Sequence, residues 1–302
     1  MASLHDKIPI PPIVSLRRYG DILGLLPLLR FLSFQQKAPV KLVVHRAFSS
    51  ILDGVSYVDP IIWDGDMDDP LPAAKKHGGI NAQVHGKGLF PNRSISDFAK
   101  HSWTQLGYKW NRHLPLVLDR RNSEREKLLA EKTYTTKLPK ILVKLKSFSS
   151  PFPDEEKIRK LIQDEFSTLA EIVNLDEVNG ERIYDLLGLL DKAACMVSAD
   201  TCTLWLAKAS NCPVVALVNP APFLDSPPTG HVLLRLPYTS AVPRWDRIAT
   251  AIHSTLFDPG GDGMALVFSE FTPSDLDTKR RNGVARATWP LLKARLLPFN
   301  SK

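Results

Sequence analysis

The sequence predicts an α/β protein of two halves, each a parallel β-sheet with crossover helices. Short apolar runs alternate with helical patterns in both halves, which is the order typical of parallel sheets. Residues 133–139 are predicted to link the halves, and 302 residues are enough for two domains that each bury a core. We therefore expect one domain at 1–138 and a second at 139–302.

The first half opens with an apolar strand at 12–16, a turn at Gly20 and a leucine-rich helix at 22–34. The segment 64–79 is charged and rich in Pro and Gly, which predicts a loop. The other elements expected before the linker are strands at 41–45, 58–63 and 80–85 and helices at 47–53 and 123–132.

In the second half, Pro153 and the three carboxylates after it predict the start of a helix. Proline suits the first turn, and acidic side chains suit the positive end of the helix dipole. The expected strands are 140–145, 194–198, 212–218 and 232–236. The expected helices are 154–166, 178–190, 202–209, 245–256 and a terminal helix at about 285–297.

Composition excludes several classes of protein. The sequence has no run of about eighteen apolar residues, so no membrane span is expected. Cys195, Cys202 and Cys212 are too few for a disulfide framework, and their spacing lacks the paired cysteines and histidines of a zinc site. We expect a cytoplasmic protein.

The net charge of +7 belongs entirely to the first half. Residues 1–138 hold 20 Lys and Arg against 13 Asp and Glu, whereas residues 139–302 hold 19 against 19. Such an excess on one domain indicates an anionic partner or surface. A basic, solvated face that only aids solubility is the alternative.

Residues 85–121 combine basic and aromatic side chains. Cations neutralise phosphates and aromatic rings stack on bases, so this mixture is typical of a nucleic-acid surface. The candidates are Lys87, Arg93, Trp103, Tyr108, Trp110 and Arg112. The alternative is a helix that buries Phe98, Trp103 and Leu106 and turns its charges outward. Both interpretations stay open at this point.

Asp21 stands at the junction of the first strand, the glycine turn and the first helix. Open α/β sheets place their ligands near the carboxyl ends of strands, which makes Asp21 a candidate for chemistry. Aspartate is also a favoured helix N-cap, because its oxygen accepts from unpaired backbone N–H groups. On these residues alone, the N-cap is the simpler interpretation.

Two motifs resemble signatures of the heptosyltransferase-like glycosyltransferases of family nine. Gly20-Asp21-Ile22-Leu23, followed by Pro27-Leu28-Leu29, resembles the loop after that family's first strand. Ala199-Asp200-Thr201, followed by Cys212-Pro213-Val214-Val215-Ala216-Leu217, resembles its second signature, an Asp-Thr pair at a helix start ahead of a strand. The resemblance runs loosely over residues 10–220.

The resemblance implies a GT-B fold, in which two Rossmann-like domains face a central cleft and the terminal helix, about 285–297, packs back on the first domain. It implies inverting transfer from a nucleotide-diphosphate sugar without a bound metal. The first domain would hold the acceptor, with Asp21 as general base beside Gly20. The implied donor-binding residues are Lys144, Lys146, Ser147, Asp200, Thr201 and Cys202.

The sequence departs from the family at Cys202 and Trp205, where the family has glycine and histidine, so heptose as the donated sugar does not follow. Two acceptors fit the one-sided charge. The segment 85–121 favours a hydroxymethylated base in DNA, and we take this as the main reading, whereas the resemblance favours the inner core of lipopolysaccharide. A non-catalytic nucleic-acid-binding protein on a degenerate GT-B scaffold is a further alternative. We expect a monomer.

Overall fold

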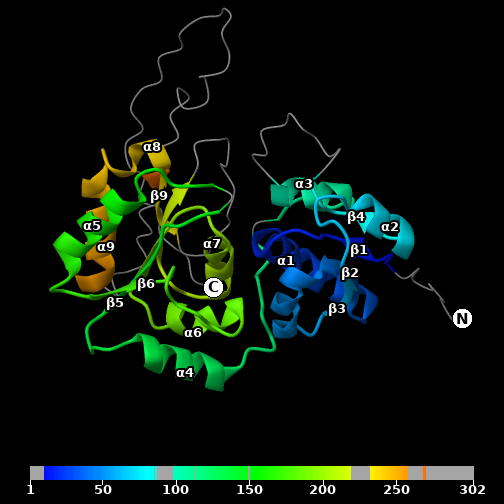
Figure 1. The fold of residues 1–302 in the computed structure, drawn as a ribbon, viewed down its shortest axis with the longest axis horizontal. Coiled ribbons are helices and arrows are strands. Elements are labelled where there is room, and N and C mark those ends of the chain that lie inside the picture. The colour runs from blue at the N-terminus through cyan, green and yellow to red at the C-terminus, as the bar shows by residue number, and fades with distance from the viewer. Residues whose placement is uncertain are drawn as a thin grey trace, which may run out of the picture.

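The computed structural model describes residues 10–84, 86, 98–111, 113–148, 150–218, 232–257 and 268–269. It confirms the predicted α/β class, with two β-sheets in two lobes that lie side by side (Figure 1). All strand pairs in both sheets are parallel. Among these residues, no helix has the length and apolar character needed to cross a membrane.

The first lobe contains a four-stranded sheet. Its strands are β1 (Ile13–Val14), β2 (Val40–His45), β3 (Val58–Trp63) and β4 (Ile80–Asn81), in the order β3-β2-β1-β4. Its helices are α1 (Tyr19–Gln36), α2 (Leu71–His77), α3 (Phe98–Gln105) and the 3-10 helix η1 (Arg46–Gly54). This order gives the βα alternation that the sequence predicts.

The second lobe contains a six-stranded sheet. Its strands are β5 (Lys140–Lys144), β6 (Glu171–Asn174), β7 (Cys195–Ser198), β8 (Val214–Val218), β9 (Val232–Pro237) and β10 (Phe268–Ser269), in the order β10-β9-β8-β7-β5-β6. Its helices are α5 (Glu155–Phe166), η2 (Ile183–Leu186), α6 (Leu187–Leu190), α7 (Cys202–Leu206), η3 (Ala207–Ala209), α8 (Tyr238–Ala241) and α9 (Trp245–Phe257).

Some predicted elements are wrong. The predicted loop 64–79 contains α2, whose prolines stand at the helix start and whose Gly78 closes the helix in the left-handed conformation at φ 59°. The Pro and Gly residues that suggested a loop therefore mark the start and the end of this helix. The strand β6 was not predicted, and the single helix expected at 178–190 is replaced by η2 and α6. The terminal helix expected at 285–297 lies outside the described residues.

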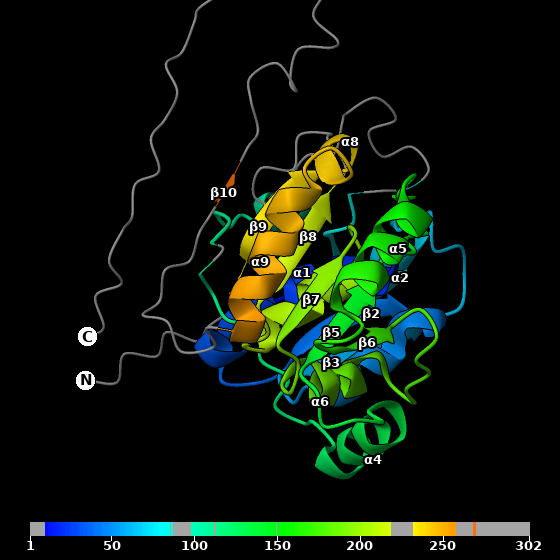
Figure 2. The same cartoon turned by 90° about the vertical axis from the view of Figure 1, so that its left-hand side faces the viewer.

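The two faces of the second sheet have different coverings. Helices α5 and α9 cover one face (Figure 2), where Phe166 of α5 and Ile252 of α9 are fully buried in a core of their own. The opposite face contributes Leu142, Met196 and Ala216 to another core cluster. That cluster also contains buried side chains of the first lobe, so one apolar core runs through both lobes.

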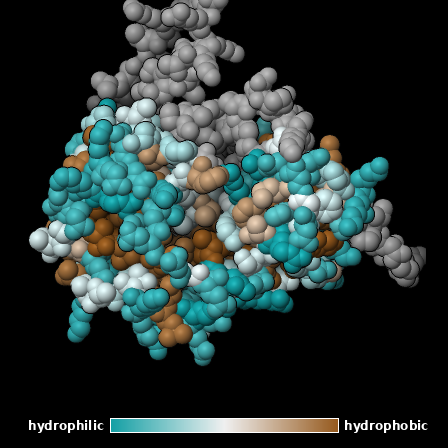
Figure 3. Space-filling model, in the orientation of Figure 1, coloured by the Kyte–Doolittle hydropathy of each residue, from teal (hydrophilic) through white to brown (hydrophobic). Residues whose placement is uncertain are grey.

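The helix α4 (Ser123–Thr133) connects the lobes and packs against α6 of the second lobe (Figure 1). Its N-cap is Asn122, whose side-chain oxygen accepts from the Arg125 amide at 2.9 Å. A Cβ on Gly188 of α6 would lie 2.6 Å from the Glu126 Cβ, so only glycine permits this close approach. The face of the molecule drawn in Figure 3 is mostly polar, and one of its apolar patches lies over α4, where Leu128 is exposed.

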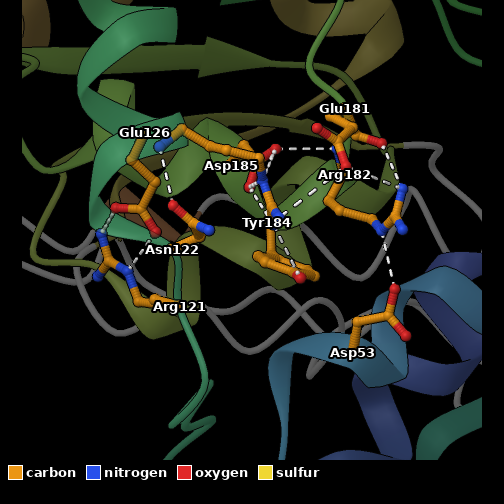
Figure 4. Close-up of polar contacts among 9 residues, drawn as sticks. Asp53, Arg121, Asn122, Glu126, Glu181, Arg182, Tyr184 and Asp185 are labelled. Atoms are coloured by element: carbon orange, nitrogen blue, oxygen red, sulfur yellow. Dashed lines mark hydrogen bonds and ion pairs between the residues drawn. The ribbon is translucent and has the colours of Figure 1, made fainter.

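An ionic cluster lies between α4, η2 and the first lobe (Figure 4). The buried Asp185 carboxylate accepts from the Arg125 guanidinium at 3.0 Å and from the Arg182 amide at 2.9 Å. The Arg182 guanidinium donates to Asp53 of η1 at 2.8 Å. This last pair joins the two lobes on the side where α4 connects them.

Candidate active site

Asp21 lies in the first turn of α1, directly after the loop that follows β1. The loop is held by the Leu16 amide, which donates to the Gln83 side chain at 2.8 Å, and by Arg17, which pairs with Asp68 at 3.1 Å. The helix begins at Tyr19 with Arg18 in the N-cap position, so the interpretation of Asp21 as the N-cap is wrong. Its carboxylate is available for another role.

The Asp21 carboxyl is partly shielded from solvent, and this controls its acidity. Burial raises the pKa of Asp21 to about 6, against the opposing charges of Arg17 and Arg18. A carboxylate with a pKa near the working pH is well suited to accept a proton. The electrostatics of Asp21 therefore match the role of general base that the sequence resemblance implies.

On the second lobe, three segments are tied together at the carboxyl edge of the sheet. The Ser147 hydroxyl, after β5, donates to the Asp200 carbonyl oxygen at 2.7 Å. The Asp200 amide donates to the Tyr238 hydroxyl at 3.1 Å, and that hydroxyl donates to the Ser150 carbonyl oxygen at 2.9 Å. These bonds fix the turn after β7, which lies where α/β sheets bind their ligands.

The Asp200 turn carries a second shielded carboxylate and a group of hydroxyls. Burial raises the pKa of Asp200 to about 6, and the positive charge of Arg235 opposes this rise. The hydroxyls of Thr201 and Thr203 lie 2.6 Å apart, and the Ser198 hydroxyl lies 3.3 Å from that of Thr201. The turn thus offers polar atoms that can bind a ligand.

The structure brings these two parts of the chain together. A Cβ on Gly20 would lie 3.6 Å from Trp205 Cδ1 and 4.0 Å from the Cys202 Cα, so the start of α1 packs on α7 of the second lobe. Nearby, the Arg18 guanidinium lies 4.9 Å from the centre of the Phe148 ring, which belongs to the loop after β5. Gly20, the residue before Asp21, therefore packs on the helix that follows the Asp200 turn, although the two segments are far apart in sequence.

Lys144 has a partner that the sequence did not reveal. Its ammonium pairs with the Asp176 carboxylate at 2.5 Å, and Asp176 also accepts from Arg159 at 3.1 Å and from the Lys146 amide at 3.2 Å. Burial would raise the pKa of Asp176, but these donors outweigh it and hold that pKa below its usual range. The charge of Lys144 is thus already compensated by a carboxylate.

Of the predicted acceptor residues in 85–121, the structure describes Trp103, Tyr108 and Trp110, and each of these packs on another aromatic side chain of the protein. Trp103 is 1% exposed, and its indole N–H donates to the Gly24 carbonyl oxygen at 3.2 Å, so a base cannot stack on it and that prediction is wrong. Tyr108 meets Phe31 edge-on at 6.4 Å, and Trp110 meets Trp103 at 4.7 Å. Lys87, Arg93 and Arg112 lie outside the described residues.

Several residues of the site were not predicted from the sequence, namely Arg18, Phe148, Tyr238 and Arg235. Tyr238 follows β9 directly, and a residue just after a parallel strand reaches the ligand edge of a sheet, so its position was a usable signal. No comparable signal marks Phe148, because its contact with Arg18 depends on how the lobes meet. In the described part of the chain, no cluster of three or more His, Cys, Asp or Glu side chains is arranged to hold a metal ion.

The fold defines the chain as an α/β protein of the GT-B type, with two lobes that each contain a parallel sheet. It is similar to a glycosyl transferase of family 9 from Veillonella parvula, with 13% identity, a TM-score of 0.55, and coverage of 83% of this chain and 98% of that one. It is also similar to the E. coli ADP-heptose lipopolysaccharide heptosyltransferase II, with 12% identity, a TM-score of 0.58, and coverage of 83% and 99%.

A third similar structure is the iron-containing dodecameric glycosyltransferase TibC of enterotoxigenic E. coli, with 14% identity, a TM-score of 0.51, and coverage of 76% of this chain and 62% of that one. No family model and no curated protein sequence matches the chain. The predicted resemblance to family nine and the predicted GT-B fold are thus confirmed in the three-dimensional structure, where sequence identity is low.

Proposed function

We propose that the protein is an inverting glycosyltransferase that moves a sugar from a nucleotide-diphosphate sugar to a hydroxyl of an anionic acceptor. The observation that carries this proposal is Asp21, a shielded carboxylate with a pKa of about 6, whose neighbour Gly20 packs on the helix that follows the Asp200 turn of the other lobe. In this arrangement the domain 1–138 holds the acceptor and the domain 139–302 holds the donor.

The proposed reaction needs one base and one leaving group. The Asp21 carboxylate takes the proton of the acceptor hydroxyl, whose oxygen attacks the anomeric carbon of the donor sugar. The bond between that carbon and the diphosphate breaks, and its electron pair leaves with the nucleoside diphosphate. Attack from the face opposite the leaving group inverts the configuration of the sugar.

The proposed donor site uses the carboxyl edge of the second sheet. Ser147, Asp200 and Thr201 present hydroxyl and backbone groups there, and Cys202 lies beside them. Lys146 is exposed at this edge and is the lysine that we place at the diphosphate, whereas the charge of Lys144 is compensated by Asp176. The similar heptosyltransferase II uses ADP-heptose, which makes an ADP-sugar the first donor to test.

For the acceptor, we place the inner core of lipopolysaccharide first. The similar E. coli enzyme is a lipopolysaccharide heptosyltransferase, and the positive charge of the first half suits a phosphorylated sugar. A hydroxymethylated base in DNA stays a prediction with weaker support, because Trp103 is buried.

A metal-free reaction, a monomeric state and a cytoplasmic location also stay predictions. The similar structure TibC is dodecameric and contains iron.

The test is incubation of the protein with ADP-heptose, ADP-glucose and UDP-glucose, each with lipopolysaccharide inner core or with hydroxymethylated duplex DNA, read by mass spectrometry. We expect one sugar mass to be added to the inner core. A sugar added to DNA would restore the DNA acceptor. Absence of transfer and of donor hydrolysis in every mixture would favour the non-catalytic alternative, which the substitution of glycine by Cys202 motivates.

A further inference from the structure

Arg18 is a half-buried cation at the mouth of the proposed site. It lies three residues before Asp21, and among the described residues no carboxylate forms an ion pair with it. Its neighbour Arg17 differs, since Arg17 pairs with Asp68 at 3.1 Å. The Asp21 carboxylate interacts with Arg18 through its charge without forming an ion pair with it. A half-buried guanidinium that forms no ion pair keeps N–H groups that can donate to an incoming anion.

The observed neighbour of Arg18 is the Phe148 ring, 4.9 Å from the guanidinium carbon. Phe148 is 90% exposed, and it sits between Ser147 and Ser150, whose polar atoms hold the Asp200 turn and Tyr238. The contact therefore runs from the first lobe to the loop that we place at the donor. A cation–π contact at an exposed ring contributes only about 0.5–1 kcal/mol, so an anion that offers two charged oxygens competes with it easily.

Two other cations near this loop, Lys144 and Arg159, are paired with a carboxylate, whereas Lys146 is an exposed ammonium. The Asp176 carboxylate holds both Lys144 and Arg159. A planar guanidinium also matches the geometry of a phosphate better than an ammonium does, because two of its N–H groups donate in parallel. These contacts leave Arg18 well placed for an incoming oxyanion.

We propose that Arg18 binds a phosphate group of a substrate and exchanges its contact with Phe148 for that group, which makes it a specificity-determining residue of the cleft. This inference rests on the proposed function. The phosphate has two sources, the diphosphate of the donor and a phosphate on the acceptor core. Arg18 faces both, because it belongs to the loop of Asp21 and touches the loop of Ser147.

The test measures binding, so that it does not depend on turnover. Titration calorimetry compares wild type with Arg18→Gln in two arms. One arm uses ADP and adenosine, and the other uses lipopolysaccharide inner core with and without phosphatase treatment. The matched control is Arg17→Gln, which removes the same charge from the same loop and acts on the same Asp21 carboxylate, while the Arg17 side chain is directed to Asp68.

We expect Arg18→Gln to weaken the binding of one phosphorylated ligand by about tenfold to a hundredfold, as for the loss of a hydrogen-bonded charge, with less than about threefold change for its dephosphorylated partner. Loss confined to ADP identifies the donor diphosphate, and loss confined to the phosphorylated core identifies the acceptor. In either case Arg17→Gln is expected to change affinity by less than about threefold. Melting curves check that both variants are folded.

Three results would overturn the inference: equal affinities of Arg18→Gln and wild type in both arms, equal losses in Arg17→Gln and Arg18→Gln, or wild type that binds none of the four ligands. Phosphate-dependent binding that requires Arg18, without sugar transfer in any mixture, would contradict the proposed function and leave this inference in place. Phosphate binding by Arg18 and sugar transfer by the protein can therefore be disproved independently of each other.

Discussion

The two lobes meet in two places that differ in chemistry. Beside the candidate active site, Gly20 packs on Trp205 and Cys202, and this contact is apolar. On the side of the linker, Arg182 reaches Asp53 through an ion pair between side chains that are substantially exposed. We infer from the comparison that packing of the start of α1 on α7 sets the position of Asp21, whereas the charged contact on the other side tolerates adjustment.

The largest effect on turnover is expected at Asp21, which follows Gly20 at the contact between the lobes. Asp21→Asn keeps the shape of the side chain but cannot accept the proton, so the transfer rate should fall by about 10²–10⁴-fold. Affinity for ADP, measured by calorimetry, should stay within about threefold of wild type. A variant with wild-type turnover would remove Asp21 from the mechanism.

On the linker side, the largest effect is expected at Asp185, which is 1% exposed and holds Arg125 and the Arg182 amide. Asp185→Ala leaves these donors without their carboxylate and should lower the free energy of unfolding by about 3–5 kcal/mol. Urea denaturation measures this change. Asp185→Asn retains an acceptor oxygen and serves as the milder control.

Substitutions of Gly20 test the packing of α1 on Trp205. Gly20→Leu should push α1 away from Trp205 and move Asp21, with a loss of about a hundredfold in turnover, because small misplacements of a catalytic group are costly. Gly20→Ala is the matched control, since its Cβ would meet Trp205 at an ordinary contact distance of 3.6 Å. If both variants kept full turnover, the close contact would not be what positions Asp21.

The pH dependence of transfer reports the same carboxylate. Because Asp21 acts only when deprotonated and its pKa is about 6, turnover should rise about tenfold per pH unit below pH 6 and level off above pH 7. A rise in turnover centred near pH 4, the range of an ordinary carboxyl group, would contradict the role of Asp21 as the general base.

The contribution of Asp21 to the free energy of unfolding changes with pH in the opposite direction to turnover. The folded pKa of Asp21 lies above its ordinary value of 3.8, so the stabilising contribution of the protonated form is complete below about pH 4 and is lost as the pH rises through 6. Asp21→Asn is neutral at every pH. It should therefore raise the melting temperature by a few degrees at pH 7.5 and leave it unchanged at pH 4.

The smallest effect is expected at the exposed ion pair. Asp53→Asn removes the partner of the Arg182 guanidinium and should change the free energy of unfolding by less than about 1 kcal/mol, with turnover within about twofold of wild type. High salt should have a similarly small effect on wild type. A large loss of turnover in Asp53→Asn would show that the linker side also positions the cleft.

Local patterns predicted those parts of the fold that depend on local contacts. The apolar run of β3 was predicted with its observed bounds, and the leucine-rich helix after Gly20 was placed within α1. The Asp21 and Asp200 motifs were found because each follows a recognisable strand. Their proximity was expected from the resemblance, and the packing of Gly20 on Trp205 now accounts for it physically.

The features that could not be predicted from local patterns are contacts that join distant residues. Lys144 was expected at the donor, but its partner Asp176 lies on a different segment, and no local pattern shows that pair. Trp103 was open to two interpretations, because a tryptophan on a basic helix has the same sequence whether it faces solvent or the core. Only the packing against α1, with the hydrogen bond to Gly24, decides for the core.

The single core that runs through both lobes has a consequence for how the protein unfolds. Leu142 and Met196 of the second sheet belong to the same buried cluster as Leu26 and Leu29 of α1. Separation of the lobes would expose these side chains to water, which links the melting of one lobe to that of the other. Calorimetry should therefore record one cooperative transition, and a chain cut between residues 133 and 139 should yield two fragments that aggregate when isolated.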